Sequence, residues 1–385
     1  MLNFEFSNPT RLVFGRDTIA RLSDLVPKGA RVLLTYGGGS IFRNGVHASV
    51  RAALDDAFVV EFGGIEPNPR YETLMKAVRL VREKEIDFLL PVGGGSVLDG
   101  TKFIAAAVKY DGPDAWEILR SNGGCVKAAL PLGAVLTLPA TGSEANGSAV
   151  ISRDETTEKL GFWSELVYPR FSILDPATTF TLDARQTGNG VVDAFVHTTE
   201  QYVTVHKDSV LQDRFAEGIL STLIEEGPKV LASPSDYASR ANVMWAATMA
   251  LQGAMGAGLP GDWASHGIGH ELTAFYGLDH ARTLAVVLPG VWRHQLEMKK
   301  ERLAKYGARV WGLTGEPAWV ASRAIELTEA FFESMGVPTR LSDHGIDAVQ
   351  AGAKVRARFA QRGTRQGENG SLSPEDIEKI IVSRA

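Results

Sequence analysis

The chain has 385 residues, of which 44% are hydrophobic, so it is long enough to fill the cores of two or three domains. Its 40 Lys and Arg residues against 45 Asp and Glu residues give a formal net charge of −5. This balance excludes the basic field that holds nucleic acid or an acidic membrane surface. A single cysteine excludes an internal disulfide and fits a reducing cytoplasm, where we expect the protein to be located.

The first residues alternate apolar Leu2, Phe4 and Phe6 with polar residues, which predicts a β-strand rather than a signal peptide. From there to about residue 180, short apolar runs alternate with amphipathic stretches, which is typical of parallel βαβ units. No apolar run approaches the roughly 18 residues of a membrane span, so we expect no membrane partner. The expected strands include 31–36, 56–62, 87–92 and 133–141, and the expected helices include 75–85 and 101–108.

Beyond about residue 183 the pattern changes to longer segments of helical period, and strand-like runs are scarce. Pro228 and Gly336 lie where helices are expected to stop. The polar, turn-rich stretch 361–376 predicts an exposed loop before a final short helix. We therefore predict an α/β dinucleotide-binding domain over residues 1–180 and an all-helical domain over residues 181–385.

The tetrapeptide Gly-Gly-Gly-Ser occurs twice, directly after an apolar strand each time. The first copy is Gly37, Gly38, Gly39 and Ser40, and the second is Gly93, Gly94, Gly95 and Ser96. Such a turn lets backbone N–H groups approach a phosphate closely, while the dipole of a following helix favours the negative charge. A plain tight turn is the alternative for either copy alone. Two copies at equivalent places predict a dinucleotide site, although neither fits the G-x-G-x-x-G fingerprint.

The residues after the first strand indicate which dinucleotide binds. No Asp or Glu that could pair with an adenosine ribose hydroxyl follows Tyr36; small residues, Ser40 and then Arg43 follow instead. Without an acidic residue at this place, the site would tolerate a 2′-phosphate on the ribose, which favours NADP(H).

Polar residues follow the second turn as well. Asp99 and Lys102 fall on the helix expected after this turn, where they could contact the cofactor. For Lys102, a solvated ion pair on the helix surface is at least as good an interpretation. The segment 139–148 supplies hydroxyls and an amide through Thr141, Ser143 and Asn146, as a loop contacting a polar ligand would require. An ordinary loop capped by Ser and Thr remains the alternative.

One carboxylate and three or more histidines lie in two short segments of the second half. Asp193 and His197 are four residues apart, so on a helix they project from one face. His266 and His270 have the same spacing, and His280 follows the break expected at Gly277. An oxygen and three imidazoles suit a Lewis-acid metal such as zinc or ferrous iron, although a histidine satisfied within the core is the commoner outcome for any one of these residues.

The segment around His266 reads His-Gly-Ile-Gly-His, so the His-Glu-x-x-His motif of metal-dependent hydrolases is missing. Peptide hydrolysis is therefore disfavoured. The two glycines are poor helix formers, which suggests that another group comes close to that backbone.

With these motifs in place, the sequence resembles the iron-containing (group III) alcohol dehydrogenases along essentially its whole length. The nearest subgroup is similar to NADPH-dependent butanol dehydrogenases and broad-specificity aldehyde reductases. The segments that carry the resemblance include TYGGGS, FGGIEPNP, VGGGSVLDGTKFIA, LTLPATGSE, NGVVDAFVHTTEQYV and GHELTAFYGLDHARTLAVVLP.

The resemblance implies a dehydroquinate synthase-like fold in which metal and nicotinamide meet in a cleft between the two domains. It implies one divalent metal per chain, zinc or iron, held by Asp193, His197, His266 and His280. His270 would be free of the metal and would relay a proton. The implied cofactor contacts are Gly38, Ser40, Asn68, Gly94, Gly95, Ser96, Thr137, Leu138, Thr141, Asn146 and Lys159.

We therefore expect an oxidoreductase that moves a hydride between NADP(H) and a small aldehyde or primary alcohol. One alternative is a lyase like dehydroquinate synthase, which shares the architecture and uses nicotinamide and metal without net oxidation. A second is a nucleotide-binding protein without catalysis. Helical domains of this kind often pair, and the strand expected at Leu2–Phe6 offers an edge, so we also expect a homodimer.

Overall fold

The structure is a computed structural model that describes residues 1–205 and 208–385. The chain forms two compact units. The first combines residues 7–182 with residues 233–248, and the second combines residues 1–6, 183–232 and 249–385. The first unit is α/β and the second is helical, as the hydrophobic patterns predict.

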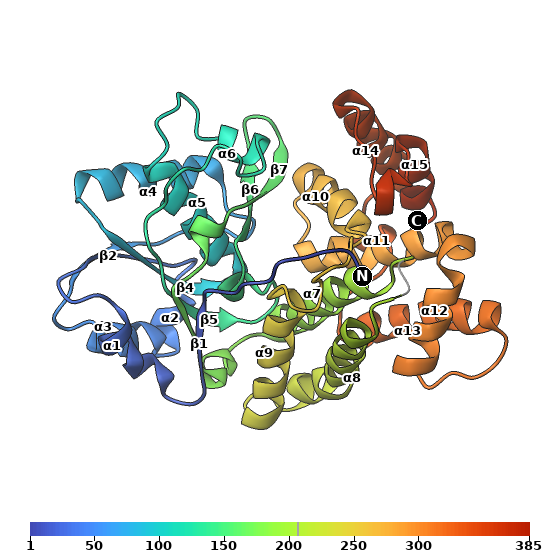
Figure 1. The fold of residues 1–385 in the computed structure, drawn as a ribbon, viewed down its shortest axis with the longest axis horizontal. Coiled ribbons are helices and arrows are strands. Elements are labelled where there is room, and N and C mark those ends of the chain that lie inside the picture. The colour runs from blue at the N-terminus through green and yellow to red at the C-terminus, as the bar shows by residue number, and fades with distance from the viewer. Residues whose placement is uncertain (206–207) are drawn as a thin grey trace. The chain divides into compact units, whose positions relative to one another are not determined.

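The α/β unit is built on a six-stranded parallel sheet with the order β1-β8-β5-β4-β2-β3 (Figure 1). Its strands are β1 (Arg11–Phe14), β2 (Arg31–Thr35), β3 (Phe58–Phe62), β4 (Phe88–Gly94), β5 (Ala134–Leu138) and β8 (Phe171–Leu174). An antiparallel hairpin, β6 (Ser148–Arg153) and β7 (Glu158–Trp163), forms a separate two-stranded sheet that the sequence analysis did not anticipate.

Helices cover both faces of this sheet because its central strands are apolar on both sides. Val32 and Leu34 of β2 belong to the core beneath one set of helices, and Leu33 belongs to the core beneath the other. The first set is α1 (Leu22–Leu25), α2 (Ser40–Arg43) and α3 (Val46–Ala53); the second is α4 (Tyr71–Glu83), α5 (Gly95–Val108) and α6 (Glu117–Arg120) (Figure 1). Met244 of α9 (Tyr237–Leu251) packs with apolar residues of β5 and β8.

The second unit consists of long helices. They are α7 (Ala184–Tyr202), α8 (Val210–Ala232), α10 (Ala264–Tyr276), α11 (His280–His294), α12 (Leu296–Val310), α13 (Pro317–Ser334), α14 (Ala348–Arg362) and α15 (Pro374–Val382). Asp183 caps α7 by accepting a hydrogen bond from the backbone N–H of Gln186. Among the described residues, no helix combines the length and the apolar character needed to cross a bilayer.

The strand predicted at residues 2–6 is wrong. Residues 1–10 form no strand, and the side chains of Leu2, Phe4 and Phe6 are exposed. The backbone N–H of Leu2 donates to the carbonyl oxygen of Gly258, but one such bond is no ladder, and a strand needs a continuous partner. The alternation in the sequence therefore marks a segment for which the described residues provide no pairing edge.

Two further predictions in the second half need correction. Helix α8 continues through Pro228 to Ala232, so packing of buried residues such as Val230 outweighs the roughly 3 kcal/mol that an internal proline costs. The stretch 361–376 is not wholly exposed, because Glu368 is buried and its carboxylate accepts a hydrogen bond from Lys299. The helix end at Gly336 is confirmed, since α13 ends at Ser334.

Candidate metal centre and cofactor site

The sheet has a topological switch point between β2 and β4. Strand β2 connects onward to β3 on one side, whereas β4 connects onward to β5 on the other side. In open α/β sheets, ligands bind in the crevice at the carboxyl ends of the strands at such a point. The two Gly-Gly-Gly-Ser turns follow β2 and β4, and Thr35 lies opposite Pro91 in the register of these strands. Both turns therefore lie at the switch point.

The second turn is tightly packed. Strand β4 ends at Gly94 and helix α5 begins at Gly95, so no loop separates them. A Cβ atom on Gly95 would lie 2.4 Å from Oγ1 of Thr141, and one on Gly93 would lie 2.6 Å from a methyl of Val97. Side chains are excluded here by the protein itself, and no side chain of the N-cap residue Gly94 caps the start of α5, whose first N–H groups have no partner within the helix.

The first turn contains a glycine that protein packing does not require. A Cβ atom on Gly38 would meet no atom of the described residues within 4 Å. Its backbone also lies outside the left-handed region that favours glycine. Space is therefore open beside this backbone for a group that is not part of the described residues.

Other predicted cofactor contacts meet near the second turn. The backbone N–H of Asn68 donates to Oγ of Ser96 at 3.3 Å, and Nζ of Lys159 on β7 donates to Oδ1 of Asn68 at 2.8 Å. Leu138, at the end of β5 after Thr137, pairs with Gly94. The structure thus brings four segments that are distant in sequence to one end of the sheet.

A buried polar network fixes the segment after β5 against α5. Asp99 accepts hydrogen bonds from the hydroxyl of Ser143 at 2.6 Å and from the backbone N–H of Val150 at 2.9 Å. Lys102 is fully buried and donates to the carbonyl oxygen of Asn146 at 2.8 Å. Burial lowers the pKa of Lys102 to about 8. The alternative of a solvated ion pair at Lys102 is therefore wrong, and both carboxylate oxygens of Asp99 bind groups of the protein itself.

Four side chains of the helical unit converge on one point. Asp193, His197, His266 and His280 each offer one ligand atom, and these atoms all lie within 4.8 Å of one another. Oδ1 of Asp193 is 3.7 Å from Nδ1 of His197 and 3.8 Å from Nε2 of His280. The rings of His197 and His266 stack with their centroids 4.6 Å apart. One carboxylate oxygen and three imidazole nitrogens gathered this closely fit a single divalent ion.

The local sequence explains this convergence. Asp193 and His197 are one turn apart on α7, and the apolar residues beside them, such as Val192 and Val196, are fully buried. Helix α10 ends at Tyr276, and Gly277, the residue that follows, has a φ of 69°; this left-handed residue lets the chain turn back into α11. His280 is the first residue of α11, so the turn carries it back to His266.

Glu200 is a site residue that the sequence analysis missed. It lies three residues after His197 and seven after Asp193, so a helical face already pointed to it. Its Oε2 is in hydrogen-bond contact with Nδ1 of His266, and its Oε1 accepts from the backbone N–H of Ser265 at 2.6 Å. Burial, reinforced by the charge of Asp262, raises the pKa of Glu200, whereas the hydrogen bonds from Ser265 and the charge of Lys299 oppose this change.

A buried ion cluster lies behind Glu200. Nζ of Lys299, which is fully buried, is 2.5 Å from a carboxylate oxygen of Asp262 and 2.8 Å from one of Glu368. The backbone N–H of Asp262 donates to the carbonyl oxygen of Glu200. Helices α7 and α12 and the loops at 262 and 368 are therefore held together beside the histidines.

The glycines between His266 and His270 are close to other groups, as predicted. A Cβ atom on Gly267 would overlap the side-chain amide of Gln366, and one on Gly269 would lie 2.8 Å from Oγ1 of Thr283. The approaching groups are thus side chains of the same helical unit.

His270 lies beside the cluster without belonging to it. Its ring centroid is 5.3 Å from that of His280 and 6.3 Å from that of His266. The ring centroid of Trp263 is 5.3 Å from that of His266, and Trp263 has a left-handed backbone with a φ of 56°. No sequence signal marks that conformation, which is uncommon for a bulky residue.

Residues 9–176 match the family described as iron-containing alcohol dehydrogenase, and residues 187–384 match the C-terminal domain of the same family. The chain belongs to the iron-containing alcohol dehydrogenase family. It is 56% identical to the NADPH-dependent aldehyde reductase YqhD of Escherichia coli, with 100% of each chain covered. It is also 43% identical to the probable NADH-dependent butanol dehydrogenase 1 of Bacillus subtilis, with 99% of each covered.

Solved structures agree with this assignment. The crystal structure of E. coli YqhD is similar with a TM-score of 0.98 at 54% identity, covering 100% of this chain and 99% of that one. The NADH-dependent butanol dehydrogenase A of Thermotoga maritima gives 0.95 at 35% identity, with the same coverage. These similarities confirm the predicted fold class, and the comparisons give no support to the lyase alternative.

Proposed function

We propose that the protein is an NADPH-dependent aldehyde reductase that binds one divalent metal, zinc or iron, per chain. The observation that carries the proposal is the convergence of Asp193, His197, His266 and His280, whose ligand atoms lie within 4.8 Å of one another. The names of the relatives support the reaction, since the 56% identical relative is an NADPH-dependent aldehyde reductase. Small aldehydes and primary alcohols are the proposed substrates.

The cofactor would be held at the switch point of the sheet. The proposed contacts are Gly37, Gly38, Gly39, Ser40, Asn68, Gly94, Gly95, Ser96, Asp99, Thr137, Leu138, Thr141, Asn146 and Lys159. The first N–H groups of α5 suit a pyrophosphate. Absence of an acidic residue after β2 supports NADP(H), and we place the dinucleotide domain at residues 1–180 and the metal-binding domain at residues 181–385.

When bound, the metal supplies Lewis-acid polarisation of the carbonyl oxygen and NADPH supplies the hydride for the carbonyl carbon. Asp193 and the three histidines hold the ion, and Glu200 fixes the ring of His266 through Nδ1. An imidazole nitrogen of His270 supplies the proton that the product oxygen needs, directly or through a water molecule. The balance is one aldehyde, one NADPH and one proton giving one alcohol and one NADP⁺.

Replacement of His266 by Ala tests the metal centre. The expected result is loss of bound zinc or iron, measured by elemental analysis, together with loss of NADPH oxidation in the presence of butanal. His344→Ala is a matched control, because His344 is a partly buried histidine of the same helical unit outside the cluster. Unchanged metal content and turnover in the His266 variant would refute the assignment.

We also propose a homodimer in the cytoplasm. Leu2, Phe4 and Phe6 are each about half exposed, with values of 55%, 52% and 46%, on an extended segment. Such an apolar edge supports pairing with the same segment of a second copy. Light scattering checks this, and a single peak at the 41.5 kDa of one chain would contradict it.

A further inference from the structure

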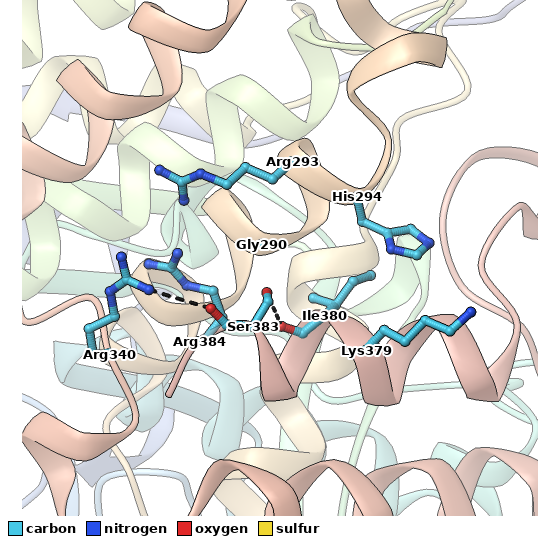
Figure 2. Close-up of a pocket in the computed structure, with 8 residues that line it drawn as sticks. All are labelled: Gly290, Arg293, His294, Arg340, Lys379, Ile380, Ser383 and Arg384. Carbon is cyan, nitrogen blue, oxygen red and sulfur yellow. Dashed lines mark hydrogen bonds between the residues drawn. The ribbon is translucent and has the colours of Figure 1, made fainter.

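A hollow in the helical unit is lined by basic side chains and lies outside the proposed metal centre. It has a volume of about 390 Å³ and is formed by the carboxyl-terminal ends of α11 and α15 and by residue 340 (Figure 2). Its charged lining residues are Arg293, His294, Arg340, Lys379 and Arg384. Such a concentration of cations is unusual for a chain with a formal net charge of −5.

Three guanidinium groups meet around a single carboxylate, that of Glu329. Arg293 donates to Oε2 of Glu329, and Arg384 donates to Oε1. Nη2 of Arg340 is 3.9 Å from the same Oε1. Burial alone would raise the pKa of Glu329, but the hydrogen bond from Arg293 and the charge of Arg384 outweigh it and lower that pKa. Three positive charges thus face one negative charge.

The other basic residues at this hollow, His294 and Lys379, share one carboxylate and do not remove the excess of positive charge. Nε2 of His294 is 3.3 Å and Nζ of Lys379 is 3.6 Å from Oδ1 of Asp376. A third carboxylate, that of Asp343, accepts from the backbone N–H of Arg340. Four permanent cations and these three carboxylates leave a net charge of +1 even with His294 neutral.

Arg384 forms the rigid floor of the hollow. Its side chain is buried, and it donates from Nε to the carbonyl oxygen of Val286 at 3.0 Å and from Nη2 to that of Thr339 at 2.8 Å. The side chain crosses α11 at Gly290, where a Cβ atom would lie 2.9 Å from Cδ of Arg384. A buried guanidinium held by three partners is preorganised, so a ligand would not have to order it.

The cations at this hollow repel one another. Burial lowers the pKa of Arg384, Glu329 opposes that change, and the charges of Arg340 and Arg293 lower the pKa further. Arg293 and Arg340 keep side chains that are 40% and 43% exposed, so both can reach a ligand from solvent. An oxyanion seated between them would relieve the repulsion and accept forked hydrogen bonds from both.

We propose that this hollow, which we call the arginine pocket (Arg293, Arg340, Lys379 and Arg384), binds a phosphate group, free or as a small phosphate monoester. A tetrahedral phosphate anion complements the excess of positive charge and offers enough oxygens for several guanidinium forks. The volume of about 390 Å³ leaves room for a phosphate with a short organic substituent. The pocket is independent of the proposed cofactor and metal sites.

The test measures phosphate binding to the full-length protein saturated with NADP⁺, so that phosphate sites for the cofactor are filled. Isothermal titration with inorganic phosphate is done at constant ionic strength set with chloride. We expect the double variant Arg293→Gln/Arg340→Gln to bind phosphate at least about tenfold more weakly than the wild type. The variant leaves Arg384 and Glu329 as a balanced pair, so it should fold.

The matched control is Arg309→Gln/Arg323→Gln, which removes the same charge from exposed positions on α12 and α13 of the same unit. It should bind phosphate as the wild type does. Equal weakening in both double variants, or wild-type binding no stronger than that of chloride, would overturn the proposal. Glycerol 3-phosphate and citrate, titrated in parallel, distinguish the ligand class, and tighter binding of citrate through the same arginines would also overturn it.

A measurement without variants guards against misfolding. Phenylglyoxal modifies accessible arginines, and peptide mass spectrometry locates the modified residues. Phosphate should protect Arg293 and Arg340 in the wild type while leaving the modification of Arg323 unchanged. Equal modification of Arg293 with and without phosphate would contradict the arginine pocket as a phosphate site.

Discussion

Glu200 and His266 are joined through Oε2 and Nδ1, and Glu200 shares its helix with Asp193 and His197. A carboxylate that holds one imidazole nitrogen fixes the ring orientation and leaves the other nitrogen for a metal. The same carboxylate is anchored by the backbone N–H of Ser265, the neighbour of His266. The geometry of the proposed metal centre therefore depends on Glu200, which lies outside the four residues whose ligand atoms converge.

Replacing Glu200 with Gln should lower metal affinity by about 10- to 100-fold. The Gln side chain can still accept from Ser265, but its NH₂ group would then face Nδ1 of His266 and place the ring proton on Nε2, where a metal could no longer bind. Metal content after dialysis against graded chelator measures the effect, and excess metal should restore activity. Unaltered metal retention would show that the contact is only structural.

The matched control for this variant is Glu271→Gln. Glu271 is also a buried carboxylate of the helical unit, and it pairs with Arg358 and Arg362 instead of a histidine. Its replacement should lower thermal stability without changing the affinity for metal. A parallel loss of metal in both variants would point to general destabilisation.

Replacing His270 with Ala should separate proton supply from metal binding. His270 lies beside His280 and His266 but outside the group of ligand atoms that converge. We expect kcat for aldehyde reduction to fall by about 100-fold, within the range for loss of a general acid. Metal content should stay at the wild-type level, whereas His280→Ala should lose both. A kcat within twofold of wild type would leave proton supply to another group.

Replacing Gly38 with Ala tests the first glycine turn. A Cβ atom at this position meets no atom of the described residues within 4 Å, so stability should stay the same or rise by about 0.5 kcal/mol. If the turn faces the cofactor, the added methyl should weaken NADPH binding by about tenfold, as measured by fluorescence titration. Gly218→Ala, on the open surface of α8, is the control and should leave NADPH binding unchanged. Wild-type affinity in Gly38→Ala would place the cofactor elsewhere.

Hydrophobic period was enough to predict β2, β3, β4, β5 and the helical second half, because these elements bury continuous apolar faces such as Val32 to Leu34. It did not single out β8, which has only four residues. It failed where a partner decides the structure. Residues 2–6 alternate like a strand yet find no ladder, and the hairpin of β6 and β7 carries Lys159 to Asn68, a contact that no local pattern encodes. Pro228 stays inside a helix because packing outweighs its local preference.

The same distinction applies to the site. Spacing of three and four residues on α7 places Asp193, His197 and Glu200 on one face, so all three could have been found from the sequence. The left-handed backbone of Trp263 and the buried Lys299 beside Asp262 depend on contacts between distant helices and loops. Nothing near either residue in the sequence signals those contacts.

Asp114 gives a stability prediction with a defined pH dependence. Burial alone would raise its pKa, but hydrogen bonds from Arg153, the backbone of Trp116 and the hydroxyl of Tyr71 outweigh it and lower the pKa from 3.8 to about 2. A lowered carboxyl pKa stabilises the fold above pH 3.8, and this stabilisation is lost as the pH falls toward 2. The side chain is 39% exposed, so solvent screening limits the contribution to about 1 kcal/mol.

Asp114→Asn should therefore lower the melting temperature at pH 7 and pH 5 alike, with the difference in melting temperature from the wild type narrowing below pH 4. The neighbouring Asp111→Asn, at an exposed position, should show no gap, and a constant gap down to pH 3 for Asp114→Asn would contradict the ionic origin.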